Sequence, residues 1–323
     1  MNGPTGEACD LSIIVVNYNT AHLLEEMFDA VEGAIGALSV QKIVVDNASR
    51  DGSAVLLRER YPDVELIVNA ENVGFGRANN QALALARGRL LLLLNTDAFV
   101  AAGGIERSVR FLDANPQCTV LGVRLVGRDG VLQPCCRYFP TPWNEFLVRT
   151  GLDRVFRGTR LVDDMAWDHA SPRECDWVPG CYLLLRRSVV ERIGLFDPRY
   201  FLYYEEVDHC KAERAAGGKV MYDPETTVVH IGGESAKSDS ELTGSGRQIS
   251  ALQIESALLY YRKHHGLAGL WLGVGLAGFG DALLTLKWLI RQRSWRGAGA
   301  YVRHFATTWS LLVRTGWARR PTR

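Results

Sequence analysis

Asp97 has the residue type and the position of a ligand for a charged group. It ends the sequence Asn95-Thr96-Asp97, which follows residues 90–94, all leucine. Five leucines are too apolar for a strand with one wet face, so they predict a central strand covered by helices on both sides. A carboxylate at the carboxyl end of such a strand faces the crevice where α/β sheets bind ligands. Asp97 is therefore a candidate metal ligand; the alternative is a cap for the helix expected from residue 104.

A second group of acids follows an aromatic run. Residues 201–204 are FLYY, and Glu205, Glu206 and Asp208 come directly after them. On a helix Glu205 and Asp208 share one face, whereas Glu206 is turned about 100° away. Aromatic walls would raise the pKa of a carboxyl toward that of a general base. The alternative is an acidic first turn that complements the helix dipole.

His230 ends a late apolar stretch and is followed by Ile231 and two glycines. A lone histidine is more often structural than a ligand, but one that leaves a strand into a flexible loop can reach a metal held by Asp97. Residues 235–246, rich in serine and glycine, predict a mobile loop.

The elements that must position these residues alternate in type. Apolar runs at 11–18, 42–45, 64–68 and 90–94 predict strands, and the segments between them predict helices. Such βαβ repeats build a mostly parallel, Rossmann-like sheet with helices on both faces, which binds nucleotides at its carboxyl edge. The sequence GFGRAN at residues 74–79 lacks the spacing of a dinucleotide fingerprint, which disfavours a dehydrogenase.

After residue 118 the pattern becomes antiparallel. A strand at 119–126, a turn at 127–130 and a strand at 131–135 predict a hairpin. Residues 143–169 are mixed and predict a lid or an acceptor-facing region. We therefore divide the chain into a catalytic domain at 1–246, with halves at about 11–126 and 127–246, and a helical region at 247–323.

The C-terminal region predicts two helices. Residues 247–265 are amphipathic, and residues 267–290 are mostly apolar apart from Asp281 and Lys287. Arginines and tryptophans flank these helices, which favours contact with a membrane interface. The alternatives are a true span and a helical appendage packed on the enzyme or on a second subunit.

Composition sets further limits. The 323 residues are 47% hydrophobic and 23% charged. The net charge of only +1 gives no overall positive potential that would favour binding of nucleic acid. Seven cysteines without a CxxC pair indicate reduced thiols, and the first ten residues do not form a secretory signal. We expect a cytoplasmic protein, peripherally associated with the inner face of the cell membrane.

Several motifs together resemble one enzyme family. IVVNYN, VVDNASRDGS, ENVGFGRANN, LLNTDA, WVPGCYLLLRR, FDPRYFLYYEEVDHCKAER and VVHIGGES occur in an order and spacing similar to those of family 2 inverting glycosyltransferases, in particular the bacterial rhamnosyltransferase-like branch. The resemblance covers residues 11–261. It implies a GT-A fold, a nucleotide-diphosphate sugar donor such as a dTDP- or UDP-sugar, and a divalent metal, Mg²⁺ or Mn²⁺.

The resemblance also implies roles for individual residues. Tyr18 would stack on the base and Asp46 would hydrogen-bond it; the candidate donor-site residues are Tyr18, Asn19, Asp46, Asn72, Gly74, Asn79, Asn95, Thr96 and Asp97. Asp97 and His230 would hold the metal, with Asn95 replacing the family's first acid. Trp177, Gly180 and Cys181 would shape the acceptor side. Glu206 would be the base, with Glu205 as its competitor and Asp208 as a supporting acid.

The leading hypothesis is an inverting transferase that moves a sugar, with rhamnose as one candidate, to a hydroxyl of a glycan or lipid-linked acceptor in cell-surface polysaccharide or glycolipid synthesis. A base on the acceptor and a metal on the leaving diphosphate would suffice for this. The alternative is a nucleotide-sugar or carbohydrate-binding module that has lost catalysis, because Asn95 and Glu206 replace commoner acids. A homo-oligomer is compatible with the sequence.

Overall fold

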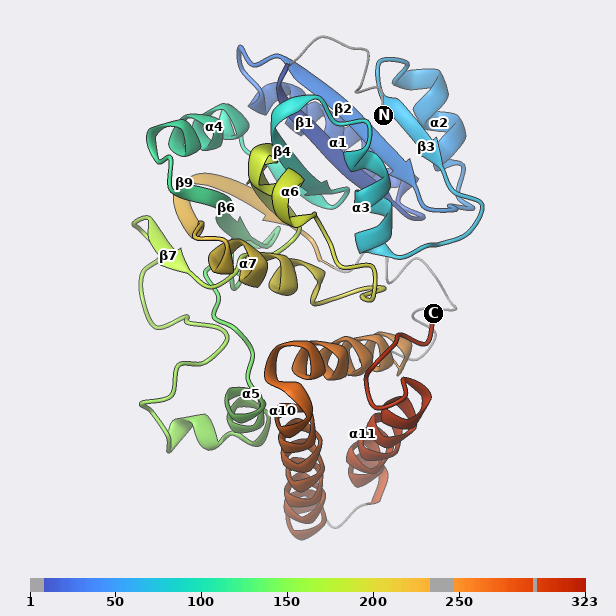
Figure 1. Ribbon diagram of the computed structural model, residues 1–323, viewed down its shortest axis with the longest axis vertical. Coiled ribbons are helices and arrows are strands. Elements are labelled where there is room, and N and C mark those ends of the chain that lie inside the picture. The colour runs from blue at the N-terminus through green and yellow to red at the C-terminus, as the bar shows by residue number, and fades with distance from the viewer. Residues whose placement is uncertain (1–8, 233–246, 293–294) are drawn as a thin grey trace. The chain divides into compact units, whose positions relative to one another are not determined.

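The computed structural model describes residues 9–232, 247–292 and 295–323. The chain forms two compact units (Figure 1). The first contains residues 1–137, 165–198 and 205–244, and the second contains residues 138–164, 199–204 and 245–323. The predicted boundary at residue 246 lies one residue from the observed start of the C-terminal segment, residue 245. The second unit also includes residues 138–164 and 199–204, which the prediction assigned to the catalytic domain.

The first unit is built on a nine-stranded sheet with the order β3-β2-β1-β4-β8-β6-β9-β5, and β7 pairs with β9. The strands are β1 (Cys9–Asn17), β2 (Val40–Asp46), β3 (Glu65–Val68), β4 (Gly88–Asn95), β5 (Ala98–Val100), β6 (Cys118–Val126), β7 (Arg173–Cys175), β8 (Tyr182–Arg186) and β9 (Lys219–His230). The predicted α/β sheet is confirmed.

The four strands β3, β2, β1 and β4 are parallel, as the apolar runs predict. The five leucines of β4 are all buried, because β1 and β8 flank the strand and helices cover the sheet. In the register Asn17 faces Asp46, and Val16 faces Asn95. The polar residues after these strands therefore meet at one edge of the sheet.

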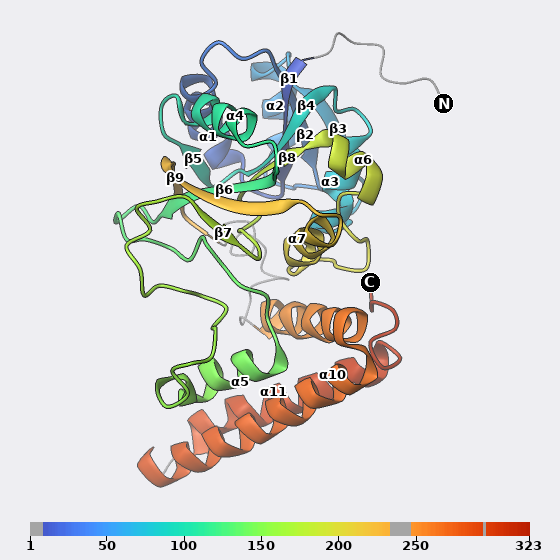
Figure 2. The same ribbon diagram turned by 60° about the vertical axis from the view of Figure 1, so that its left-hand side comes forward.

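Helices cover both faces of this sheet. Figures 1 and 2 show α1 (Ala21–Ala34) and α4 (Gly104–Ala114) on one face, and α3 (Phe75–Leu83), α6 (Arg187–Ile193) and α7 (Glu205–Ala215) on the other. The short helix α2 (Ser53–Arg60) contacts the edge strand β3. In α1 the buried residues recur every three or four positions, so one apolar stripe faces the sheet.

The second half of the sheet is mixed. Strand β8 runs antiparallel to β4 and β6, whereas β6 runs parallel to β9. The predicted hairpin strand at 131–135 is wrong: after the turn only an isolated bridge joins Leu132 to Val126. Backbone hydrogen bonds from Gly127 to Val131 and from Gln133 to Leu125 accompany this bridge, and Pro134, which has no N–H to donate, follows directly.

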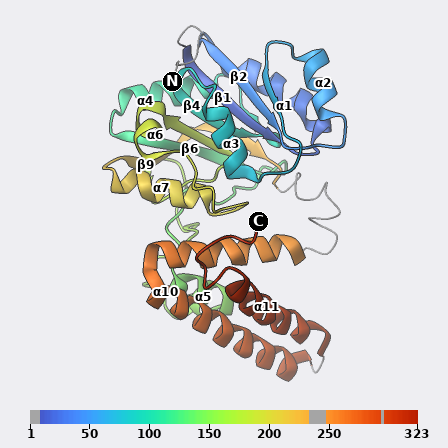
Figure 3. The same cartoon turned by 45° about the vertical axis from the view of Figure 1, so that its right-hand side comes forward.

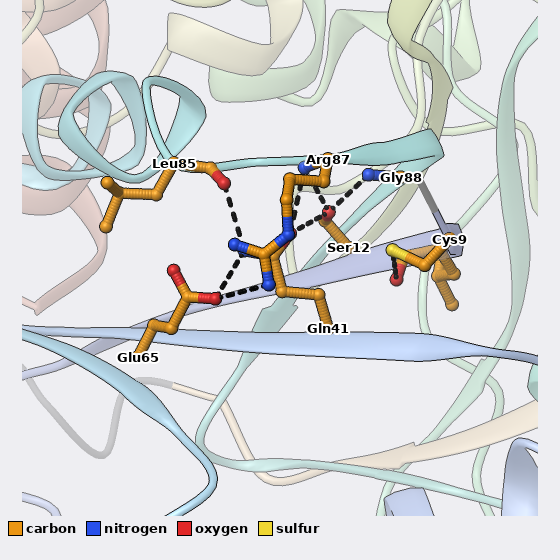
Figure 4. Close-up of polar contacts among 8 residues, drawn as sticks. Cys9, Ser12, Gln41, Glu65, Leu85, Arg87 and Gly88 are labelled. Atoms are coloured by element: carbon orange, nitrogen blue, oxygen red, sulfur yellow. Dashed lines mark hydrogen bonds and ion pairs between the residues drawn. The ribbon is translucent and has the colours of Figure 1, made fainter. Parts of the chain in front are cut away.

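A partly buried polar network joins the amino ends of the parallel strands (Figure 4). The Ser12 hydroxyl donates to Gln41 Oε1 at 2.6 Å and accepts from the backbone N–H of Gly88 at 2.8 Å. Gln41 Nε2 donates to Glu65 Oε1, which also pairs with Arg87. Because β1, β2, β3 and the start of β4 share this network, their register is fixed at the edge opposite the polar loops.

The second unit is helical. Figure 3 shows its members, α5 (Pro142–Thr150), α10 (Arg247–Gln292) and α11 (Trp295–Arg314); a short 3₁₀ turn, η1 (Leu152–Arg154), follows α5. Gly266, with φ 65° and ψ −163°, breaks α10 into two helices, as predicted. Over Ala251–Arg291 the helix is long and apolar enough to cross a membrane, by length and composition alone. The predicted loop at 235–246 lies outside the described residues.

Candidate active site

Asp97 and His230 lie side by side because β5 pairs with the end of β9. In this antiparallel pair Ala98 lies opposite His230. Asp97 directly precedes Ala98, so it adjoins the end of β9. Asp97 Oδ2 accepts the backbone N–H of Gly232 at 3.0 Å, and Asp97 Oδ1 lies 3.6 Å from His230 Nε2. The helix α4 begins after Gly103 without a side-chain cap, so Asp97 does not cap it.

Gln133 fixes the tautomer of His230. Its Nε2 donates to the carbonyl oxygen of His230 at 2.8 Å, which directs its Oε1 toward His230 Nδ1 at 2.9 Å. His230 Nδ1 is therefore the protonated ring nitrogen, and Nε2 presents a lone pair toward Asp97. Burial lowers the pKa of His230, against the opposing charge of Asp97.

A neutral imidazole nitrogen beside a carboxylate oxygen fits a divalent cation of the Mn²⁺ type. In the described ranges, no group of three or more His, Cys, Asp or Glu side chains has the arrangement to hold a metal. These two protein ligands would therefore be completed by donor oxygens and water.

The loops after β1 and β2 form the first part of the candidate donor site. Asp46 is buried; its Oδ2 accepts from Asn17 Nδ2 at 2.8 Å and its Oδ1 from the Ser49 backbone at 2.9 Å. Asn19 has φ 53°, and its Oδ1 accepts the backbone N–H of Arg50 at 2.7 Å. Tyr18, between Asn17 and Asn19, is half-buried.

Asn72 and Gly74 shape the turn into α3. Asn72 Oδ1 accepts from Asn47 Nδ2 at 2.8 Å and from the backbone of Gly74 at 2.9 Å, while Gly74 itself has φ 90°. Asn79 is placed differently: it is buried, and its Nδ2 donates to the carbonyl oxygen of Phe75 at 2.9 Å within its own helix. Asn79 therefore supports the first turn of α3.

Thr96 links the ends of β1 and β4. The Thr20 hydroxyl lies 2.7 Å from Asn17 Oδ1 and 2.9 Å from Thr96 Oγ1, and all three side chains are buried. Asn95 lies beside them and is half-buried. The polar groups between Asp46 and Asp97 are thus connected through one network.

The second acidic group starts α7. Glu205 and Asp208 share a face and are each 4% exposed, whereas Glu206 is turned away from them and half-buried. Glu206 Oε2 has no hydrogen-bond partner within the described part of the chain. Burial raises the pKa of the Glu206 carboxyl, against backbone N–H groups of the first turn and the Arg137 guanidinium. An acidic first turn placed only for the helix dipole would be exposed to solvent, whereas Glu205 and Asp208 are buried.

Gly180 and Cys181 lie between the two acidic groups. A Cβ at Gly180 would lie 3.7 Å from the Cβ of Glu206, and the Cys181 carbonyl accepts the backbone N–H of Asn95 at 3.0 Å. Burial raises the pKa of the Cys181 thiol, and the charges of both Asp97 and Glu206 add to that rise. Both carboxylates are therefore within electrostatic range of one side chain.

Comparison with known proteins gives the family of this site. Residues 12–152 match the model of Glycosyl transferase family 2. The chain therefore contains a family 2 glycosyltransferase domain. The glycosyltransferase is 28% identical over 254 residues to the N-acetylglucosaminyl-diphospho-decaprenol L-rhamnosyltransferase of Mycobacterium tuberculosis, covering 71% of this chain and 78% of that one.

Solved structures show that the glycosyltransferase has the GT-A fold. The mannosyltransferase PcManGT from Pyrobaculum calidifontis, in complex with GDP-Man and Mn²⁺, aligns with a TM-score of 0.55 and 17% identity over 99% of this chain and 90% of that one. GalNAc-T7 with UDP, GalNAc and Mn²⁺ aligns with a TM-score of 0.56 and 15% identity over 80% of this chain and 51% of that one. The predicted family and fold are confirmed.

Three residues near the site of the glycosyltransferase were not predicted from its sequence. Arg137 stacks over the predicted acceptor-side residue Trp177, with its Cζ 4.1 Å from the ring centroid, and its charge acts on Glu206. Asn17 holds Asp46, and Gln133 orients His230. Only Asn17 carried a signal, because it ends an apolar strand directly before Tyr18.

Proposed function

We propose that this glycosyltransferase moves a hexose, with rhamnose as one candidate, from a nucleoside-diphosphate sugar to a hydroxyl of a lipid-linked glycan, with inversion. The observation that carries the proposal is that Gly180 and Cys181 adjoin both acidic groups: a Cβ at Gly180 would lie 3.7 Å from the Cβ of Glu206, and the Cys181 carbonyl accepts the backbone N–H of Asn95, two residues before Asp97, at 3.0 Å. A single displacement needs charge neutralisation on one side of the sugar and a base on the other, within one site.

The donor side is assigned to the edge where β1, β2 and β4 end. Asp46 and the Asn47–Asn72 pair offer fixed polar groups for a nucleoside, and Tyr18 offers an aromatic face. The two GT-A neighbours carry GDP-Man or UDP with Mn²⁺, which supports a nucleotide donor and a divalent metal here. Asp97 and His230 would hold that metal, which would supply positive charge to the leaving diphosphate.

The acceptor side is assigned to Glu206. Its Oε2 has no hydrogen-bond partner among the described residues, and burial raises the pKa of the carboxyl, so the carboxylate can accept a proton from an acceptor hydroxyl. The hydroxyl oxygen then bonds to the anomeric carbon as the bond from that carbon to the diphosphate oxygen breaks. The charge of Arg137 opposes the effect of burial on the pKa of Glu206 and so favours the ionised carboxylate, the form that accepts a proton.

The mycobacterial relative is named for a decaprenol-linked acceptor, and this chain spans 78% of its length. An apolar helix in the C-terminal region is compatible with the same type of acceptor at a membrane surface. These two observations support our proposal that the protein acts in the cytoplasm, peripherally associated with the inner face of the cell membrane.

The test is Glu206→Gln. The amide keeps the shape of the side chain but cannot take a proton, so kcat for transfer should fall about a thousand-fold, while the Kd for nucleotide sugar in the presence of Mn²⁺ stays unchanged. Glu225→Gln, on an exposed position of β9, is the matched control and should keep full activity. Retention of most activity by Glu206→Gln would show that the base is elsewhere.

A further inference from the structure

Exposed apolar side chains are concentrated in the helical unit. Of the 20 large apolar side chains exposed in the described chain, 15 belong to the second unit, although it is the smaller one. Contiguous apolar surface of this kind marks a binding site for a partner or a lipid. The arrangement of these residues along the helices indicates which.

One continuous stripe of α10 is exposed and apolar. Its members recur every three or four residues after the break at Gly266: Ala268, Leu272, Gly275, Phe279, Ala282, Leu286 and Ile290. Phe279 is 56% exposed and Ile290 is 68% exposed. In a soluble protein the exposed face of a helix carries polar residues. The exposed face of α10 carries apolar residues instead.

The helix α11 extends the same surface. Its exposed apolar residues also recur at helical spacing: Val302, Phe305, Ala306, Trp309 and Val313, followed by Trp317. The Trp271 ring lies 6.1 Å from Trp309 and 5.4 Å from Trp317, between ring centroids, which joins the two stripes. The two helices lie side by side in Figures 1 and 3, and together they form what we term the hairpin face.

The carboxylates of this region point inward. Asp281 is 3% exposed and pairs with Arg149 of α5 and with His304 of α11, whose Nδ1 lies 2.8 Å from Asp281 Oδ2. Glu255, also buried, accepts from the hydroxyl of Thr322 at 2.7 Å. Among the described residues after 250, by contrast, eight lysines and arginines are exposed, five in the helices and three after α11: Lys263, Lys287, Arg291, Arg303, Arg314, Arg319, Arg320 and Arg323.

Charge is therefore segregated along the chain. Residues 247–323 carry 12 lysines and arginines and only two acidic residues, whereas residues 1–246 carry 25 lysines and arginines and 34 acidic residues. A second copy of this hairpin would repel the first through these cations. An anionic lipid surface complements both the cations and the apolar stripes.

We propose that the hairpin face binds anionic phospholipid and lies in the plane of the membrane interface. A span by α10 would put the cluster of Arg149, Asp281 and His304 near the middle of the hydrocarbon, because Asp281 lies near the middle of the apolar stripe; this is costly. In the plane, the cluster stays on the side away from lipid. This deepens the proposed function, on which it rests, by stating how the enzyme reaches a lipid-linked acceptor.

The test measures flotation of the full-length protein with vesicles of phosphatidylcholine, with and without phosphatidylglycerol. The protein should float with the anionic vesicles and bind neutral ones at least about ten-fold more weakly, since each cation near the surface contributes about five-fold in partition. The double variant Phe279→Glu, Leu286→Glu should lose binding. Val55→Glu, Val131→Glu, on exposed positions of the first unit, is the matched control and should bind normally.

Three outcomes would overturn the proposal: equal binding to neutral and anionic vesicles, unchanged binding of the Phe279→Glu, Leu286→Glu variant, or resistance of bound protein to extraction with alkaline carbonate, which would indicate a span.

Circular dichroism shows whether the Phe279→Glu, Leu286→Glu variant is folded. A second double variant, Lys287→Gln, Arg291→Gln, keeps the apolar stripe and should bind anionic vesicles more than ten-fold more weakly than the wild type. Donor turnover with a soluble acceptor should be unchanged in both, so loss of vesicle binding is separated from failure of the proposed function.

Discussion

At the scale of single residues, the site depends on how neighbours set protonation. The hydrogen bond from His230 Nδ1 to Gln133 leaves Nε2 unprotonated, with its lone pair directed at Asp97. Burial raises the pKa of the Glu206 carboxyl. These two settings suit different tasks: His230 can bind a cation, and Glu206 can take a proton.

Replacement of Arg137 should move the pH profile of transfer. A base must be ionised, so kcat is lost as pH falls through the raised pKa of Glu206. The Arg137 charge opposes that rise, so Arg137→Gln should shift the acidic limb of the kcat profile to higher pH. Arg173→Gln is the control, because Arg173 also stacks on a tryptophan, Trp167, with a Cζ-to-centroid distance of 4.0 Å. An unshifted limb in Arg137→Gln would show that this arginine does not act on the base.

At the scale of elements, the register of the parallel strands depends on close backbone approach at Gly88. A Cβ at this position would lie 2.2 Å from the backbone nitrogen of Ser12, in the neighbouring strand. Gly88→Ala should therefore lower the free energy of unfolding by about 3 kcal/mol, as measured by urea denaturation. Gly33→Ala in α1, where nothing lies within 4 Å, is the control and should not destabilise the protein. A neutral effect of Gly88→Ala would mean that β1 and β4 separate at low cost.

The helix α5 is tied to α10 and to residues 199–204 through one buried carboxyl. Glu145 accepts hydrogen bonds from Tyr204 at 2.7 Å and from Tyr261. Burial raises its pKa above the ordinary 4.5, against these two hydroxyls and the charge of Arg149. A raised folded pKa stabilises the protein fully below the ordinary pKa, and this stability is lost as pH rises through the folded pKa.

Glu145→Gln should therefore flatten the pH dependence of Tm. In the wild type this carboxyl lowers Tm as pH rises above its ordinary pKa of 4.5 and through its raised folded pKa, and the variant should lack that contribution. Glu225→Gln, exposed to solvent, should leave the dependence intact. Identical slopes in the wild type and Glu145→Gln would contradict the assignment.

The sequence predicted the elements whose signal is local. The leucine run of β4 and the alternating strands and helices could be predicted because a buried parallel strand needs a continuous apolar segment. The hairpin strand at 131–135 failed because Pro134, which cannot donate a backbone hydrogen bond, follows the short pairing of Leu132 and Gln133 with the end of β6. The contacts of Arg137 with Trp177 and of Tyr204 with Glu145 are long-range, and neither residue carries a local signal for its partner.

At the scale of the whole molecule, charge divides the chain into an acidic catalytic part and a basic helical part. If the basic part holds the enzyme on anionic lipid, ionic strength should affect one substrate class only. The KM for an acceptor embedded in phosphatidylglycerol vesicles should rise several-fold between about 0.05 M and about 0.5 M NaCl. The KM for a short soluble acceptor should not change, and a parallel rise for both would show that salt acts at the active site.

The central claim is that Asp97 and Glu206 serve one reaction from two sides of one site. Titration of nucleotide sugar, with and without Mn²⁺, into the wild type, Asp97→Asn and Glu206→Gln tests it most directly. We predict that Mn²⁺ tightens donor binding in the wild type and in Glu206→Gln, that Asp97→Asn loses this enhancement, and that neither variant transfers sugar at the wild-type rate. Mn²⁺-enhanced binding in Asp97→Asn, or its loss in Glu206→Gln, would contradict this division of roles.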